Sequence, residues 1–245
     1  MISDGEQLSL RSLSERRTPP LALNPFVEGA LGGERRRSRQ STLVPVSASS
    51  TSRAKRLLDV ILASAGILAF LPLLLLVALL IRLESPGPII YRQKRGGLMG
   101  APFEIYKFRS MRVTDDGGIV QHATKNDPRL TSIGAFLRKS SFDELPQLFN
   151  ILKGDMSIVG PRPHALRHDE LYEAQIPAYR GRMCARPGLT GLAQVSGYRG
   201  EIVNVEDMAD RVACDLEYIT NWSVMLDLKL IALTLARFPF DPQAY

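Results

Sequence analysis

Two adjacent carboxylates, Asp143 and Glu144, open the stretch of this chain whose residue types are best suited to chemistry. A short apolar segment and a Gly-Asp turn follow them, and the stretch ends on Arg162 between two prolines. Ser141 stands three residues before Glu144, which is the spacing of a capping box. We therefore expect the acid pair in the first turn of a helix that begins near Ser141.

The acid pair has two interpretations that residue types alone do not separate. Acidic residues are common in first turns because the exposed N–H groups and the helix dipole favour negative charge there. The same environment keeps a carboxylate ionised and welcomes phosphate oxygens. Asp143 could therefore attack phosphorus while N–H groups and cations hold those oxygens.

A longer motif around the pair resembles the signature of the bacterial sugar transferases, and the resemblance covers about residues 53 to 238. The motif consists of Asp143, Glu144, Leu145, Pro146, Gln147, Asn150, Gly154, Asp155, Met156, Ser157, Val159, Gly160, Pro161, Arg162 and Pro163. These proteins are monotopic phosphoglycosyl transferases, which move a sugar phosphate from a nucleotide sugar onto a polyprenyl phosphate. The resemblance implies an enzyme of that class.

The resemblance also implies roles for single residues. Asp143 matches the family's covalent aspartate, which implies a ping-pong course: a phosphosugar ester forms on Asp143, UMP leaves, and undecaprenyl phosphate accepts the sugar phosphate. Glu144 matches the second acid, which is expected to hold Mg²⁺ together with Asp143 and to assist the lipid acceptor. Arg138 stands five residues before Asp143, at the offset of a functional arginine in the family, and is expected to clamp a phosphate.

Further substrate contacts are expected from other polar side chains. Arg162 lies between prolines that restrict its backbone, and a guanidinium positioned in this way can offer phosphate two parallel donors. The alternative interpretation of Arg162 is a surface arginine in a stiff loop. A strand is expected over residues 103–108, paired with a strand at residues 89–92 across a glycine turn. Lys107 and Arg109 belong to a basic edge there. Gln194 and Arg199 lie in a second family-like motif, residues 186–200, and are expected to contact nucleotide or sugar.

A membrane helix is expected over residues 57–82. Residues 60–81 carry no charge and would be about 33 Å long as a straight helix, enough to cross a bilayer. Basic residues flank both ends, so both ends favour the cytoplasm, and Pro72 should bend the helix. We expect a re-entrant helix, hinged at Pro72, on the cytoplasmic face of the inner membrane, as the resemblance also implies. The alternative is a kinked helix that spans the bilayer.

The remaining segments predict an α+β domain over residues 53–245, anchored in the membrane by the bent helix. Helices are expected over residues 130–139 and 205–219, and an apolar segment at residues 222–238 should lie along the membrane or be buried against the domain. His164 and His168 are interpreted as part of a charged surface helix and not as metal ligands. Residues 1–52, rich in Ser, Pro, Gly and Arg, are expected to be disordered.

The formal net charge of +6 favours anionic partners, namely acidic membrane lipids or phosphorylated substrates. Nucleic acid is disfavoured because no motif that reads it accompanies the charge. Tyr198 and Gly200 resemble the family branch that contains glucose-phosphate transferases of exopolysaccharide pathways, so UDP-glucose is the expected donor. UDP-galactose and a UDP-N-acetylated sugar are alternatives.

Two rival classes of function stay open at this point. One is a glycosyltransferase that passes no phosphate and would release UDP, and the other is a non-catalytic membrane scaffold. The sequence is also compatible with a homo-oligomer.

Overall fold

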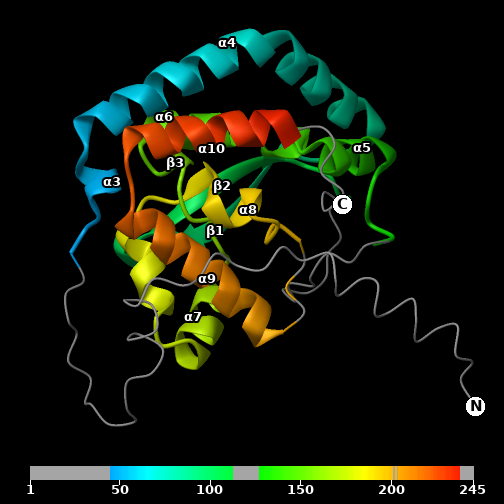
Figure 1. Cartoon of the computed structure of the whole chain (residues 1–245). Helices are drawn as coiled ribbons and strands as arrows, with labels where there is room; N and C mark the ends of the chain where they lie inside the picture. The colour runs from blue at the N-terminus through cyan, green and yellow to red at the C-terminus, as the bar shows by residue number, and fades with distance from the viewer. Residues whose placement is uncertain (1–44, 113–126, 201, 203, 238–245) are drawn as a thin grey trace, which may run out of the picture. The chain divides into compact units, whose positions relative to one another are not determined.

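The computed structural model contains a long helix, α4 (Arg53–Glu84), which Figure 1 shows as one continuous and curved ribbon. The Ser52 hydroxyl caps its start by accepting a hydrogen bond from Lys55 N at 3.3 Å, and Pro72 lies inside it. Among the described residues it is the one helix long and apolar enough to cross a membrane. The expectation of a long apolar helix is confirmed.

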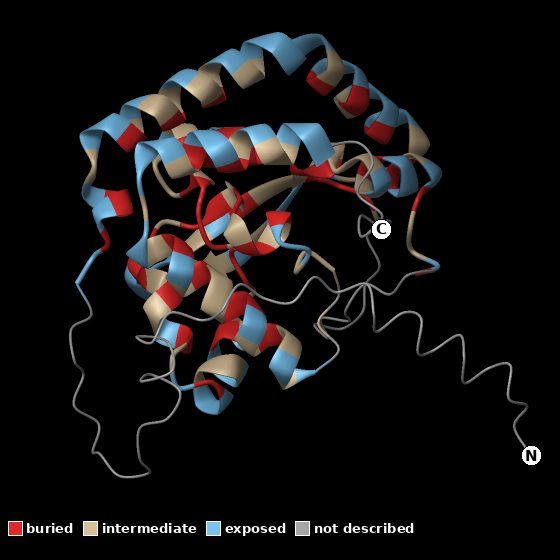
Figure 2. Ribbon diagram, in the orientation of Figure 1, coloured by how far each residue is buried: buried red, intermediate tan, exposed pale blue. Residues whose placement is uncertain are grey.

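Large apolar side chains line the outer face of α4. Leu68, Leu75 and Leu83 each expose more than 60% of their surface, and Figure 2 shows exposed positions along the whole helix. A contiguous apolar surface of this length is unfavourable in water and typical of contact with a membrane. The opposite face packs Leu74, Val77 and other residues into the core. Such a helix is consistent with membrane association.

The structure describes residues 45–112, 127–200, 202 and 204–237, all of which fall in one compact unit from Gln40 to Tyr245. Most of the predicted disordered tail, residues 1–44, lies outside the described residues. Its last part, residues 45–52, is described and includes a short helix, α3 (Ala48–Thr51), in which Ser49 and Ser50 are buried.

A two-stranded antiparallel hairpin follows α4. Its strands are β1 (Ile90–Gly96) and β2 (Pro102–Phe108), joined through the 3₁₀ turn η1 (Leu98–Gly100), so the predicted hairpin is confirmed with a longer first strand. Phe108 packs with residues of α4, including Val77 and Ile81, in one core cluster. The hairpin is thereby attached to the inner face of the long helix.

The predicted helix over residues 130–139 is confirmed as α5 (Ser132–Ser140), but the predicted capping box is wrong. Ser141 ends α5 in the left-handed conformation (φ 57°), and its side chain caps no helix. The acid pair lies on a separate 3₁₀ turn, η2 (Phe142–Glu144), and α6 (Gln147–Lys153) begins only after Pro146. The acids therefore lie in the first turn of a short helix next to Ser141, as predicted, but Ser141 precedes this helix in the left-handed conformation without a side-chain cap.

A second, parallel pair of strands holds the loop that carries Arg162. These strands are β3 (Ser157–Val159) and β4 (Gly188–Thr190), and their backbones approach so closely that a Cβ on Gly188 would lie 2.1 Å from Gly160 N. Only glycine fits such an approach. Close backbone packing against Gly160 therefore explains Gly188 and Gly191 of the second motif.

The remaining elements are α7 (Leu166–Gln175), η3 (Tyr179–Cys184), α8 (Leu192–Val195), α9 (Val205–Thr220) and α10 (Val224–Arg237). The predicted amphipathic helix at residues 205–219 is confirmed as α9. His164 does not belong to the predicted surface helix, because it precedes α7 and is buried. In α10, Asp227 and Leu230 are buried whereas Met225 and Leu235 are exposed, so this helix has both a packed and an open face. The architecture is mixed α+β with two small sheets.

Candidate active site

Asp143 and Glu144 lie side by side on η2, between the end of α5 and the start of α6. Both are buried, with 9% and 8% of their surface exposed. Burial of two adjacent carboxylates is unfavourable unless cations or hydrogen-bond donors compensate for the lost water. The structure compensates these two acids in different ways.

Two cations hold Glu144. Arg162 donates from Nη2 to Oε1 at 2.6 Å and from Nη1 to Oε2 at 3.2 Å, and Lys107 Nζ donates to Oε1 at 2.8 Å. Burial alone would raise the pKa of Glu144, but the charges of Arg162 and Lys107 outweigh it and hold this pKa well below its usual range. Glu144 is therefore ionised at neutral pH.

Asp143 is buried without such partners: no described residue donates a hydrogen bond to its carboxylate. Burial and the neighbouring charge of Glu144 raise its pKa to about 6, although Lys107, Arg138 and Arg162 act in the opposite direction. At neutral pH the carboxylate is mostly ionised and is not held by hydrogen bonds. This state suits a nucleophile or a base.

The structure gathers several of the predicted basic residues near the pair. Arg138, in the last turn of α5, lies close enough for its charge to lower the pKa of Asp143, and its Nε donates to Ser110 Oγ at 2.9 Å. Arg199 Nη2 donates to Ser141 Oγ at 2.6 Å, two residues before Asp143. With Lys107 and Arg162, these side chains form a basic cluster drawn from four separate segments of the chain.

Arg109 is not part of this cluster. It is 5% exposed, and its guanidinium donates to Pro86 O at 2.8 Å, to Ser85 O at 2.7 Å and to Ser85 Oγ at 2.9 Å. Because β2 ends at Phe108, the alternation that directs Lys107 to Glu144 does not continue to Arg109. A cation just beyond the end of α4 instead satisfies carbonyls of the turn that follows the helix, where positive charge is favourable.

Gln194 is also held away from the pair in this structure. It lies on α8, and its Nε2 donates to Leu189 O at 3.0 Å. None of its described contacts joins it to Asp143 or Glu144.

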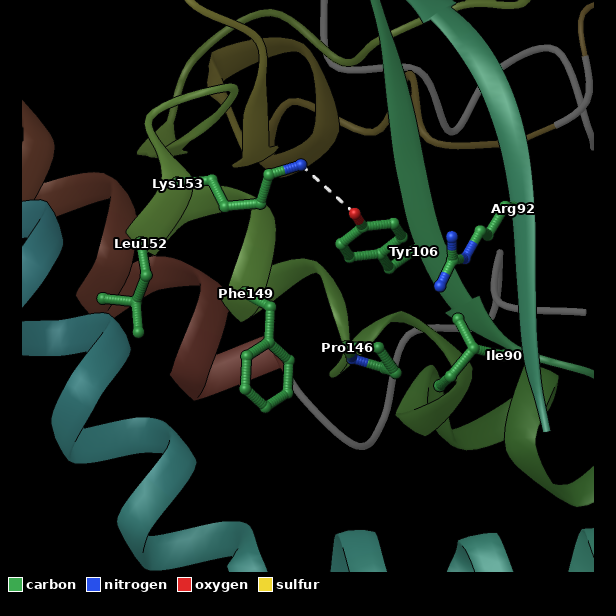
Figure 3. A pocket seen from close by; sticks show the side chains of 7 residues that line it. All are labelled: Ile90, Arg92, Tyr106, Pro146, Phe149, Leu152 and Lys153. Carbon is green, nitrogen blue, oxygen red and sulfur yellow. Dashed lines mark hydrogen bonds between the residues drawn. The ribbon is translucent and has the colours of Figure 1, made fainter.

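A hollow of about 550 Å³ lies beside α6, as Figure 3 shows. Arg92 and Lys153 flank the Tyr106 ring at 5.4 and 5.1 Å, and the Lys153 ammonium lies 3.1 Å from the tyrosine hydroxyl. The other lining residues are Ile90, Pro146, Phe149 and Leu152. Neither acid of the pair lines the hollow, so it adjoins the acid pair through Pro146 but does not contain it.

Asn150 is a structural residue whose role the sequence reasoning did not identify. It is fully buried on α6, its Oδ1 accepts from Tyr106 N at 2.9 Å, and its Nδ2 donates to Glu104 O at 2.6 Å. These bonds fix α6 to β2 and so set the position of Lys107 relative to η2. An asparagine inside a short apolar helix was the available signal, because its helix propensity is poor.

The acid pair also has a donor set that fits a divalent cation. The described residues contain no group of three or more His, Cys, Asp or Glu side chains. Mg²⁺, however, is commonly held by one or two carboxylates together with substrate phosphates and water. Glu144 accepts three hydrogen bonds, which leaves about one lone-pair site, and Asp143 accepts none from the described residues.

Most of the chain is similar in sequence to known proteins. Residues 50–240 match the family model described as Bacterial sugar transferase. The chain is 54% identical over 191 residues to a UDP-glucose:undecaprenyl-phosphate glucose-1-phosphate transferase of Caulobacter vibrioides, and the match covers 78% of this chain and 72% of that protein. It is 51% identical over 193 residues to the protein of the same name from Xanthomonas campestris pv. campestris, with 78% of this chain and 40% of that protein covered.

A more distant relative carries a different sugar in its name. The UDP-N-acetylgalactosamine-undecaprenyl-phosphate N-acetylgalactosaminephosphotransferase of Aeromonas hydrophila is 41% identical over 181 residues, which cover 74% of this chain and 42% of that protein. The family match extends over most of the chain and includes the acid pair and Arg162. The chain therefore belongs to the bacterial sugar transferase family, as its motif predicted.

Proposed function

We propose that this chain transfers glucose 1-phosphate from UDP-glucose to undecaprenyl phosphate and releases UMP, as the first membrane step of exopolysaccharide assembly. The observation that carries the proposal is the acid pair, in which a buried carboxylate that accepts no hydrogen bond from the described residues stands beside one held by two cations. The names of the two most similar relatives above support glucose as the sugar.

The reaction divides into two displacements at one phosphorus. An Asp143 oxygen attacks the phosphorus that bears glucose, the bond from that phosphorus to the bridging oxygen breaks, and UMP leaves with that oxygen. A phosphate oxygen of undecaprenyl phosphate then attacks the same phosphorus. The bond to Asp143 breaks, the carboxylate is regenerated, and the lipid carries glucose on a diphosphate.

The surrounding side chains suit the charge that this course develops. Lys107, Arg138 and Arg162 place positive charge where phosphate oxygens would lie, and preorganised charges of this kind stabilise a transition state effectively. Glu144 keeps Arg162 and Lys107 in fixed positions, and it thereby assists the lipid acceptor by holding their charges where its phosphate would attack. Arg199, next to Ser141, is placed to contact the nucleotide or the sugar.

Glu144 and Asp143 would hold Mg²⁺ through carboxylate oxygens. When bound, the ion would neutralise negative charge on the diphosphate of the donor.

The membrane part of the proposal concerns α4. We infer that α4 enters and leaves the inner membrane on the cytoplasmic face, hinged at Pro72, so that the acid pair lies at the depth of lipid headgroups. Basic residues at both ends and the proline support this topology. Single cysteines introduced by Arg53→Cys or Glu84→Cys, in a background lacking Cys184 and Cys214, should react with an impermeant thiol reagent from the same side. Reaction from opposite sides would show a helix that spans the bilayer.

The reaction is tested with detergent-solubilised protein, Mg²⁺, undecaprenyl phosphate and a panel of UDP-sugars. UDP-glucose should yield UMP and lipid-linked glucose phosphate, whereas UDP-galactose and UDP-N-acetylated sugars should yield little. UMP from an N-acetylated sugar alone would keep the reaction class and correct the sugar. Release of UDP would indicate a glycosyltransferase, and no nucleotide release at all would favour the scaffold.

A further inference from the structure

The loop that carries Arg162 is held by its carbonyl groups. Prolines flank Arg162 and have no N–H, so hydrogen bonds to this loop must come mainly from outside donors. Each backbone carbonyl from residue 161 to residue 164 accepts one hydrogen bond. In that order the donors are Gly188 N (2.9 Å), Arg182 Nη2 (2.5 Å), Arg95 Nη1 (3.4 Å) and Gly96 N (3.2 Å).

The donor to the Arg162 carbonyl is a buried cation. The Arg182 side chain is 4% exposed, and its Nε donates at 2.9 Å to Asp215 Oδ2 on α9, a carboxylate that is 2% exposed. Its guanidinium lies 5.3 Å from the centre of the Tyr179 ring, and Nη1 lies 3.1 Å from His164 Nδ1. Arg182 is therefore held by Asp215 of α9, by Tyr179 of its own element η3 and by His164 of the loop, and it holds one backbone atom of Arg162.

This contact matters because Arg162 joins two sets of bonds. Its carbonyl accepts from Arg182, and its guanidinium donates to Glu144 at 2.6 and 3.2 Å. A shift of about 1 Å in a catalytic group can cost roughly 10²-fold in rate. A buried ion pair, in contrast, is weak evidence for stability, because desolvation offsets most of its attraction.

We propose that Arg182 is a positioning residue: with Asp215 it sets the backbone of Arg162 so that the guanidinium lies against Glu144 and the substrate phosphate. The inference rests on the proposed function, because it assigns Arg182 to the site through Arg162. Neither Arg182 nor Asp215 touches the acid pair in the described contacts.

The test is a double-mutant cycle. The combined variant Arg182→Gln with Asp215→Asn removes the charges of both partners together, and Asp169, whose Oδ1 lies 4.0 Å from Arg182 Nη1, keeps its hydrogen bond from Tyr179 OH. It is made in the wild-type background and in Arg162→Ala, and kcat/KM for UMP release from UDP-glucose is measured in all four proteins. In the wild-type background it should lower kcat/KM roughly 10-fold or more, and in Arg162→Ala it should change kcat/KM by less than about twofold.

A second buried ion pair supplies the matched control. Lys55 and Asp227 are as deeply buried, their charged atoms are 2.7 Å apart, and the pair does not touch the Arg162 loop. The variant Lys55→Gln with Asp227→Asn should lower the melting temperature, and any loss of activity should be the same factor in both backgrounds.

The outcomes distinguish failure of the positioning role from failure of the proposed function. Equal factors in both backgrounds for the combined Arg182 and Asp215 variant would overturn the positioning role while leaving the proposed reaction intact. Normal activity of Arg162→Ala would overturn the role of Arg162 and the inference with it. Absence of UMP from the wild type with any UDP-sugar would overturn the proposed function and everything that rests on it.

Discussion

Buried carboxylates occur both at the acid pair and near the start of α4, and the two regions treat them differently. Near the start of α4, Asp227 is fully buried and accepts from Lys55 Nζ at 2.7 Å, Tyr218 OH at 2.8 Å and Trp222 Nε1 at 3.0 Å. On η2, Asp143 is nearly as buried, yet no described residue donates a hydrogen bond to it.

This difference in hydrogen bonding distinguishes carboxylates that hold the fold together from a carboxylate that is a candidate for catalysis. Asp59 follows the pattern of Asp227, since its Oδ1 accepts from Ser157 Oγ and from Ile158 N, both at 2.9 Å. These acids join α4 to β3 and α10 with all their bonds internal. A buried carboxylate that has a raised pKa and accepts no hydrogen bond from a described residue is a candidate for a functional site. On these grounds Asp143 is the candidate for chemistry, although all three are aspartates buried in one domain.

The largest expected effect comes from Asp143→Asn. The amide keeps the shape of the side chain but cannot form the phosphosugar ester, so UMP release should fall by roughly 10³-fold or more. The melting temperature should not fall, because no hydrogen bond from a described residue is lost. Steady-state UMP release and thermal unfolding of the same preparation check both statements, and near-normal turnover would remove the distinction between the two regions.

The opposite result is expected from Asp227→Asn. The substitution leaves Lys55 buried without its counter-charge, which typically costs about 3–5 kcal/mol of stability. UMP release per folded molecule should stay within about threefold of wild type. Denaturant unfolding and an active-site titration measure the two quantities, and a selective loss of activity without destabilisation would assign Asp227 a chemical role.

The same comparison between a catalytic and a structural side chain applies to two arginines, Arg162 and Arg109. Arg162→Ala removes a bidentate partner of Glu144 and the proposed phosphate contact, so kcat/KM should fall by roughly 10²-fold. Arg109→Gln removes donors from carbonyls near the end of α4, so it should destabilise the protein by about 1–3 kcal/mol with little change in KM. Kinetics and unfolding on both variants test the division, and a large rise in KM for Arg109→Gln would return Arg109 to the substrate site.

The smallest effect is a pH dependence of the donor half-reaction. Because attack needs ionised Asp143, and its pKa is raised to about 6, the burst of UMP without acceptor should be half-maximal near pH 6 and fall below it. The effect on stability has the opposite sign. A carboxyl whose pKa rises from 3.8 to about 6 on folding favours the folded state at low pH, and this contribution is lost as pH rises through that window. An acidic limb near pH 4 would contradict the raised pKa.

The sequence predicted those parts of the fold that depend on local patterns. The long apolar helix, the hairpin, α5 and α9 followed from periodicity and turn residues, and the family followed from the long motif around Asp143. Local patterns placed the acid pair correctly in the first turn of a short helix next to Ser141, but they wrongly predicted a side-chain cap, because Ser141 adopts a left-handed conformation that ends α5. The roles of Arg109, Arg182 and Asp215 depend on contacts between residues 20 to 33 positions apart, which spacing along the chain does not encode.

The most direct measurement is the intact mass of the purified protein after mixing with UDP-glucose and Mg²⁺ in the absence of lipid acceptor. A nucleophilic Asp143 predicts a mass increase of one hexosyl phosphate on wild type, none on Asp143→Asn, and disappearance of the adduct when undecaprenyl phosphate is added. Stoichiometric UMP release with no adduct at any time point, or an adduct that persists in Asp143→Asn, would contradict the assignment of Asp143 as the residue that carries the sugar phosphate.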